Sequence, residues 1–286
     1  MTFRQRHLAL PVAVAIAAGC LAPLAVLVAF SFYEVDDFDL IPAFSFRAWG
    51  ELATSATDWF LIGKAVLSGV TTTLFTALLG YPVALALTRL AASAKGLAII
   101  VLLTPLYTGE IVRIYAWRIV LGGEGLVNTV LLGLGLIDEP LKFLLFSPFT
   151  IGLVLTYNNL PFMVLAIWVS AEMVDRRLIE AARDLGARPV DAFFRVIFPL
   201  TTPGLAAGSL TVFALSAGEM LTPSLLGGTS GATAMALVDN LFGTAFDWPL
   251  ASALALALLA TLFLAASAMA GLLLRLKGAR AVIGRT

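Results

Sequence analysis

Six long runs of apolar residues constrain this chain more than any other feature of its sequence. A helix that crosses a bilayer needs about 20 mostly apolar residues, and only helices and closed barrels satisfy their backbone groups in lipid. The runs show no period-two alternation, so they predict helices. An all-α integral membrane protein with six transmembrane helices follows, with spans at 8–33, 65–88, 96–121, 143–171, 201–225 and 250–274.

The composition excludes several other classes of protein. Hydrophobic residues make up 60% of the chain and charged residues 13%, whereas soluble domains average about 45–50% and about 25%. A formal net charge of zero argues against a nucleic-acid partner. The single cysteine (Cys20) and the single histidine (His7) exclude an internal disulfide and a cysteine or histidine metal cluster.

The distribution of basic residues predicts the orientation. If the N-terminus is cytoplasmic, 13 of the 18 Lys and Arg residues lie on the cytoplasmic side and five lie outside. Cytoplasmic loops carry the excess of Lys and Arg, so both termini are expected in the cytoplasm. The apolar segment 125–137 is too short to cross and is expected to be an interfacial or re-entrant helix.

One polar stretch stands out in this apolar chain, and it is predicted to lie in the cytoplasm between the fourth and fifth spans. Asp175 can cap a helix start, Gly186 suits the left-handed residue that ends a helix, and Pro189 suits the first turn of another. Two short amphipathic helices joined at Gly186 are therefore expected. An ordinary loop on the membrane surface is the alternative to a contact surface for a soluble partner. The charged residues are Glu172, Asp175, Arg176, Arg177, Glu180, Arg183, Asp184, Arg188, Asp191 and Arg195.

The spacing within this stretch resembles the EAA loop of ABC importer permeases. Glu180-Ala181-Ala182 is followed by Gly186 after three residues and by Pro199 at the family's distance, while Val196 and Phe198 replace the usual aliphatic residues. The resemblance implies a coupling helix that docks into a cytoplasmic ATPase. It assigns this contact to Glu180, Ala181, Ala182, Asp184, Gly186 and Ala187.

Further segments resemble the spermidine/putrescine-type permeases, in their first-permease branch: LTPLYTGEIVRIYAW (103–117), YNNLPFMVLAIWVSAEMVDRRLIEAARDLGA (157–187) and GEMLTPSLLGG (218–228). The resemblance implies a type I importer permease fold in the bacterial inner membrane. It places a first helix and periplasmic loop at 1–63, a permease core at 64–271 with the EAA loop at 172–200, and a cytoplasmic tail at 272–286.

The same resemblance implies the partners and the solute class. The partners are an ABC ATPase dimer, a second permease in a pseudo-twofold heterodimer, and a periplasmic solute-binding protein. The sequence has no G-x-x-x-x-G-K-[ST] phosphate loop, so the chain is expected to be no enzyme and to leave ATP and Mg to the partner ATPase. The expected solute is a polyamine, with opines, phosphonates and amino-acid-like compounds as alternatives.

Charged residues inside spans are candidates for function. Glu110, Glu219 and nearby aromatic residues are a candidate gate or transient site for a cation; the alternative is a structural Glu110–Arg113 pair, with Arg118 reaching the interface. Asn158, Asn159 and Pro161 predict either a kinked, path-lining helix or a polar pair between helices. The residues assigned to the path or gate are Glu110, Arg113, Tyr115, Trp117, Asn158 and Glu219.

Two other classes of membrane protein compete with this interpretation. A secondary transporter is expected to show internal repeats or broken-helix ion sites, and no repeat is evident in the sequence. A membrane enzyme needs clustered titratable groups within a span, and the spans show none.

Overall fold

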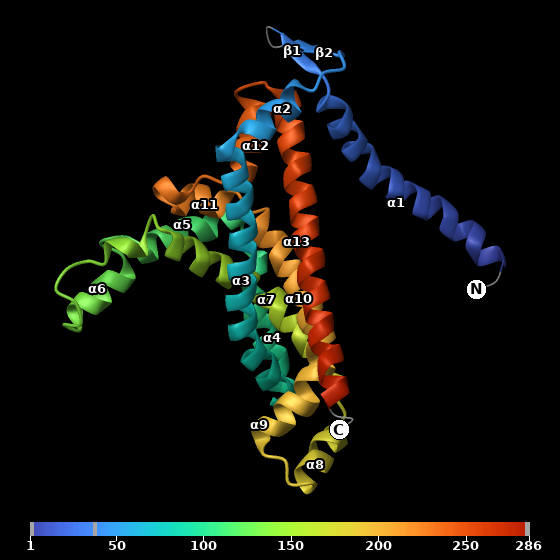
Figure 1. The fold of residues 1–286 in the computed structure, drawn as a ribbon. Helices are drawn as coiled ribbons and strands as arrows, with labels where there is room; N and C mark the ends of the chain where they lie inside the picture. Colours follow the sequence, from blue (N-terminus) through green and yellow to red (C-terminus); the bar gives the residue numbers. More distant parts are fainter. Residues whose placement is uncertain (1–2, 37–38, 284–286) are drawn as a thin grey trace. The chain divides into compact units, whose positions relative to one another are not determined.

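A computed structural model describes the backbone of residues 3–36 and 39–283. The predicted orientation of the termini depends partly on Arg4, Arg6 and residues 274–286. The side chains of these residues lie outside the described part of the structure. The chain is almost entirely helical (Figure 1). It divides into one unit of residues 1–62 and 234–261 and a second unit of residues 63–233 and 262–286.

The first unit contains α1 and a short antiparallel hairpin in which Val35 pairs with Leu40. Arg47, the first residue of α2, forms an ion pair with Asp247 at 3.0 Å. Asp247 also accepts a hydrogen bond from the backbone N–H of Leu250 at 3.1 Å, which caps the start of α13. The elements are α1 (Phe3–Phe30), β1 (Glu34–Asp36), β2 (Asp39–Ile41), α2 (Arg47–Thr54), α12 (Ala234–Gly243), and parts of α3 (Ala56–Arg89) and α13 (Trp248–Ile283).

The second unit is built around the pair α7 and α10. Gly204 and Gly208 of α10 form a G-x-x-x-G pattern, which lets membrane helices approach closely. A Cβ atom added at Gly204 would lie 2.3 Å from the Ala166 carbonyl oxygen of α7. The elements are the rest of α3 and α13, α4 (Ala92–Tyr107), α5 (Glu110–Leu121), α6 (Leu126–Gly133), η1 (Lys142–Leu144), α7 (Pro148–Glu172), α8 (Arg176–Asp184), α9 (Pro189–Ala192), the π-helix η2 (Phe193–Ile197), α10 (Phe198–Ala217), α11 (Leu221–Leu226) and η3 (Gly228–Ser230).

In the described part of the chain, four helices are long and apolar enough to cross a membrane, namely Ala56–Arg89, Pro148–Glu172, Pro189–Ala217 and Trp248–Leu273. A fifth span is formed if Ala92–Tyr107 and Glu110–Gly133, bent by 98°, are taken as one broken span. These findings confirm an all-α membrane protein. The count of six stays a prediction, because part of the first predicted span lies outside the residues with described side chains.

Two predicted spans differ from the observed helices. The run 96–121 is not one straight helix, because the backbone leaves the helical conformation at Thr108 and Gly109. Glu110 therefore begins α5 instead of lying deep within a span. The run 201–225 also breaks, because α10 ends at Ala217 and α11 begins at Leu221, which leaves Glu219 in the connection.

The run 143–171 forms α7, which begins at Pro148 behind the capping residue Ser147. This helix continues through Pro161, so the proline does not end it. Asn159 donates hydrogen bonds to the Leu155 carbonyl at 2.9 Å and to Ser216 Oγ at 3.2 Å. For Asn159, the interpretation as a polar link between helices is correct.

Candidate functional site

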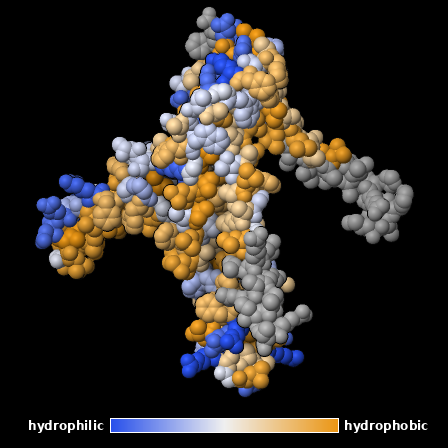
Figure 2. Space-filling view, in the orientation of Figure 1, coloured by the Kyte–Doolittle hydropathy of each residue, from blue (hydrophilic) through white to orange (hydrophobic). Residues whose placement is uncertain are grey.

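The polar loop, defined as residues 172–200, begins with a capped helix. The Asp175 carboxylate accepts a hydrogen bond from the Arg177 backbone N–H at 2.9 Å, as expected for the residue before α8. Figure 2 shows hydrophilic surface in the region where Figure 1 places α8 and α9. The first predicted helix of the polar loop is thereby confirmed.

Gly186 makes the turn that follows α8. Its φ is +83°, the left-handed conformation that other residues rarely adopt. The Gly186 N–H donates to the Arg183 carbonyl at 2.8 Å, and the Ala187 N–H donates to the Ala182 carbonyl at 3.0 Å. These two bonds form a Schellman motif with glycine in its left-handed position. A Cβ at Gly186 would meet no atom within 4 Å, so only the backbone conformation requires glycine.

The surface of this loop carries apolar groups among charged ones. No residue of α8 is buried. Leu185, next to the turn at Gly186 (called the elbow below), is 90% exposed. Leu178 and Val190 are also exposed. Exposed apolar side chains rimmed by charges are typical of a protein contact site. Of the residues assigned to the contact, Glu180, Ala181, Asp184 and Gly186 are exposed, and Ala182 and Ala187 are half-buried.

The second half of the polar loop differs from the prediction of a separate amphipathic helix. The α9 helix has only four residues and continues through η2 into α10. A π-helix has more residues per turn than an α-helix, so the expected spacing of apolar residues on one face is lost. Phe194 is exposed, whereas Phe193 is half-buried.

Two polar links connect the base of the loop to neighbouring helices. Lys95 of α4 forms an ion pair with Glu172 at the end of α7 at 2.6 Å, and its ammonium lies 5.9 Å from the ring centre of Trp168. Arg176 of α8 donates to the carbonyl of Thr88 in α3 at 3.4 Å. These contacts fasten the start of α8 to the connection between α3 and α4.

The candidate path residues come together only in part. Glu110 at the start of α5 lies close enough to Glu219 for electrostatic interaction, although 109 positions separate them in the sequence. One Glu219 oxygen accepts hydrogen bonds from the N–H groups of Leu221 at 2.9 Å and Thr222 at 3.3 Å. The two carboxyl groups thus meet where both predicted spans are broken.

The arginines of this region are occupied by other partners. Arg113 donates a short hydrogen bond to the Pro105 carbonyl; no Glu110–Arg113 ion pair forms within 4.0 Å among the described residues. Arg118 lies 5.3 Å from the ring centre of Phe146. The structural Glu110–Arg113 pair stays a prediction, because Arg113 acts electrostatically on Glu110 without a direct ion pair.

The remaining candidates have surroundings that the sequence did not indicate. Trp117 packs edge-on against Tyr157 with ring centres 5.3 Å apart, while Tyr115 is exposed. The Oδ1 atom of Asn158 is buried and has no hydrogen-bond partner in the described part of the chain. Sequence reasoning missed Tyr157, whose only signal was its position beside two asparagines.

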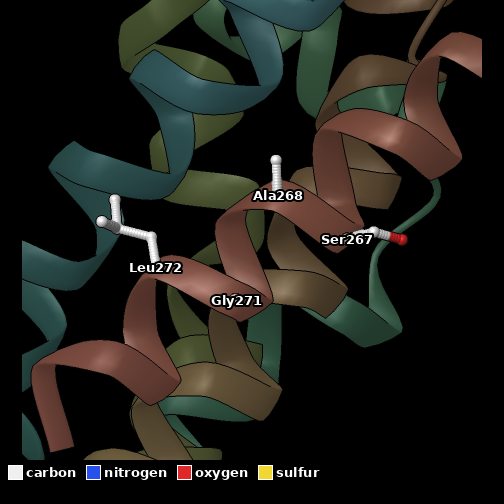
Figure 3. A pocket seen from close by; sticks show the side chains of 4 residues that line it. All are labelled: Ser267, Ala268, Gly271 and Leu272. Atoms are coloured by element: carbon white, nitrogen blue, oxygen red, sulfur yellow. The ribbon is translucent and has the colours of Figure 1, made fainter. Parts of the chain in front are cut away.

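A groove on the surface is lined by other residues than these. An open groove of about 560 Å³ lies along α13, and the four lining residues drawn in Figure 3 are Ser267, Ala268, Gly271 and Leu272. None of the four is charged, so they offer no counter-ion to a charged solute. Among the residues whose side chains the structure describes, no group of three or more His, Cys, Asp and Glu residues could hold a metal ion.

Comparison with known proteins places the chain in a family. No family model matches it. It is 32% identical over 211 residues to the inner membrane ABC transporter permease protein YdcU of Escherichia coli (strain K12), which covers 68% of this chain and 66% of that protein. It is 38% identical over 186 residues to the spermidine/putrescine transport system permease protein PotB of the same strain, covering 65% and 67%. The chain belongs to the ABC transporter permease family.

Further comparisons agree with the family. This permease is 36% identical over 196 residues to PotB of Haemophilus influenzae, and the alignment covers 67% of the chain and 66%, just under two thirds, of that relative. A crystal structure of a bacterial ABC transporter involved in alginate import matches 93% of this chain and 95% of that chain, with a TM-score of 0.68 and 16% identity. At that identity the match supports the fold alone.

Proposed function

We propose that the chain is the membrane-spanning permease subunit of an ATP-driven importer for a small polar solute in the bacterial inner membrane. The observation that carries this proposal is the polar loop. It combines the spacing of the EAA loop with an exposed, capped helix and a Schellman elbow at Gly186. Glu180, Ala181, Ala182, Asp184, Gly186 and Ala187 form the surface that docks on the ATPase.

The proposed assembly contains an ABC ATPase dimer, which binds ATP and Mg, and a second permease that completes a pseudo-twofold heterodimer. A periplasmic binding protein delivers the solute. A structure of the alginate transporter was solved with its periplasmic protein bound, and its chain matches this one with a TM-score of 0.71 and 15% identity. That likeness in fold supports a periplasmic protein as a partner of this permease.

The proposed solute is a polyamine of the spermidine/putrescine class or a similar amine. Three observations support a cationic solute: the relatives named for spermidine and putrescine, the proximity of Glu110 and Glu219, and the engagement of Arg113 and Arg118 by a carbonyl and a ring. Two carboxylates side by side repel each other, and a cation between them removes that repulsion. The candidate path consists of Glu110, Arg113, Tyr115, Trp117, Asn158 and Glu219.

The docking proposal is tested by co-purification of the permease pair with its ATPase. We expect the Glu180→Lys/Gly186→Pro variant to lose the ATPase subunit, because it reverses an exposed charge and forbids the elbow. Glu124→Lys, a charge reversal at an exposed residue before α6, is the matched control. Retention of the ATPase by the double variant at the level of the control would reject the proposed role of the loop.

The solute class is tested separately, by transport into vesicles that contain the full assembly. We expect spermidine and putrescine to compete with labelled putrescine, and an opine, a phosphonate and an amino acid to leave its uptake unchanged. Competition by a phosphonate but not by spermidine would assign an anionic solute and reject the path through Glu110 and Glu219.

A further inference from the structure

The π-helix η2 lies where the polar loop enters the membrane helices. It joins the four-residue α9 to α10, and no side chain caps it. π-helical turns are rare and occur frequently at functional sites. Pro199 and Pro203, in the first turns of α10, have no N–H group to donate. The backbone of this junction is therefore held by fewer of its own hydrogen bonds than a regular helix.

The side chain of Tyr81, in α3, contacts the first residue of the π-helix and the residue that follows its last one. Its ring packs edge-on against Phe193, with ring centres 5.5 Å apart and an interplanar angle of 80°. The same ring lies 6.0 Å from that of Phe198, the residue that follows η2. Aromatic pairs in these geometries are attractive, so the Tyr81 ring joins Phe193 and Phe198 to α3.

The Tyr81 hydroxyl adds a directional contact, a short hydrogen bond to Thr201 Oγ1. Thr201 is fully buried, and its oxygen also lies 2.9 Å from the carbonyl oxygen of Ile197, the last residue of η2. A threonine hydroxyl has one proton. When Thr201 donates it to the Ile197 carbonyl, Tyr81 donates to Thr201, and a chain of two bonds runs from α3 to the π-helix.

Other links between the polar loop and neighbouring helices are weaker because they are long or exposed to solvent. The Arg176–Thr88 contact is long, at 3.4 Å, and exposed. The Lys95–Glu172 pair is partly exposed, and such ion pairs contribute little. The Tyr81 contacts are half-buried and combine two rings with a hydrogen bond.

We propose that Tyr81 is a positioning residue that couples movement of the polar loop to α3, acting through Thr201 and the π-helix. This inference rests on the proposed function, because it requires that a partner ATPase moves the loop. When that partner displaces α8 and α9, the π-helix transmits the displacement. The ring and hydrogen-bond contacts of Tyr81, called the Tyr81 clamp, then make α3 move with the loop. Without the clamp, the π-helix rearranges locally and α3 stays behind.

The test compares the Tyr81→Phe and Thr201→Val variants with Thr202→Val in the reconstituted assembly with its binding protein. Thr202 is the matched control because it is also buried and its hydroxyl, like that of Thr201 at 3.2 Å, donates to the Phe198 carbonyl of its own helix, at 2.8 Å. Among the described residues Thr202 makes no hydrogen bond to α3. Loss of one neutral hydrogen bond corresponds to roughly a three- to tenfold effect. We expect solute-stimulated ATP hydrolysis and uptake to fall by about that factor in the first two variants. The Tyr81→Phe/Thr201→Val double variant should fall no further than either single one.

A purely structural role for Tyr81 is distinguished by spin-label distances between Arg183→Cys in α8 and Leu74→Cys in α3, in a Cys20→Ser background. We expect nucleotide trapping to leave this distance unchanged with Tyr81 present and to change and broaden it in Tyr81→Phe. If nucleotide trapping has the same effect on this distance in the parent and in Tyr81→Phe, the proposal is overturned.

Failure of this inference differs from failure of the proposed function. If Gly186→Pro abolishes stimulated hydrolysis while Tyr81→Phe behaves as Thr202→Val, the loop couples but Tyr81 does not. If the parent assembly shows no solute-stimulated hydrolysis at all, the proposed function itself is wrong.

Discussion

Substitutions at Gly186 separate the conformation of the elbow from the space around it. The φ of +83° costs a residue with a side chain roughly 1–2 kcal/mol, and no neighbouring atom within 4 Å adds a clash. We therefore expect Gly186→Ala to weaken ATPase binding by about fivefold to thirtyfold. Gly186→Asn should bind within about threefold of the parent, because asparagine tolerates the left-handed region.

Gly186→Pro should bind too weakly to measure. Proline fixes φ near −65°, on the other side of the map from +83°, and it removes the N–H that bonds the Arg183 carbonyl. The assay is the affinity of the nanodisc-embedded permease pair for the purified ATPase subunit, with Gly123→Ala as control, since a Cβ there also meets open space. Equal affinities for the glycine, alanine and asparagine forms would refute the conformational argument. If Gly186→Asn bound the ATPase as weakly as Gly186→Pro, the partner would instead require a residue without a side chain at this position.

Three further predictions concern the helix pair, the candidate path and the loop cap. Gly204→Ala should lower the melting temperature by roughly 3–10 °C, because overpacking costs about 1–3 kcal/mol, whereas Gly152→Ala, where the space is open, should not lower it; fluorescence-detected thermal unfolding compares them. Glu219→Gln should reduce uptake of a cationic solute at unchanged protein level, because the amide oxygen can still accept the backbone hydrogen bonds but no charge remains; unchanged uptake would remove Glu219 from the path. Asp175→Ala should weaken ATPase binding by roughly fivefold, because it removes a helix cap of about 1 kcal/mol. Asp175→Asn should retain the parent affinity, because asparagine can also cap the helix. Equal affinities of Asp175→Ala and Asp175→Asn for the ATPase would contradict the role of the cap.

The parts of the fold that local chemistry determines could be predicted from the sequence. The capped start of α8 follows from Asp175, and its end follows from Gly186, because each residue type satisfies a helix terminus by a local mechanism. The four long spans follow from hydropathy, because lipid requires apolar helices of that length. In each case the residue and the structure that it determines lie within a few positions of each other.

The breaks in the helices could not be predicted in the same way. Pro105 and Gly109 precede the bend between α4 and α5, but Pro161 lies inside an unbroken α7, and membrane helices tolerate both residue types. The contacts that Tyr81 makes beside the π-helix come from a distant part of the chain, so no local sequence signal indicates them. The proximity of Glu110 and Glu219 likewise depends on tertiary packing.

One helix connects the two regions that carry the proposed function. α10 begins next to the π-helix and ends at Ala217, two residues before Glu219; its 20 residues span about 30 Å. Gly204 and Gly208 hold it so closely against α7 that independent sliding of the two helices would meet backbone and side-chain contacts. We therefore expect α7 and α10 to move together, and displacement of the polar loop to change the separation of Glu219 from Glu110. When the two carboxylates approach each other, they favour a cation between them, and when they separate, they release it. The broken ends of the spans therefore suit a gate better than a fixed binding site.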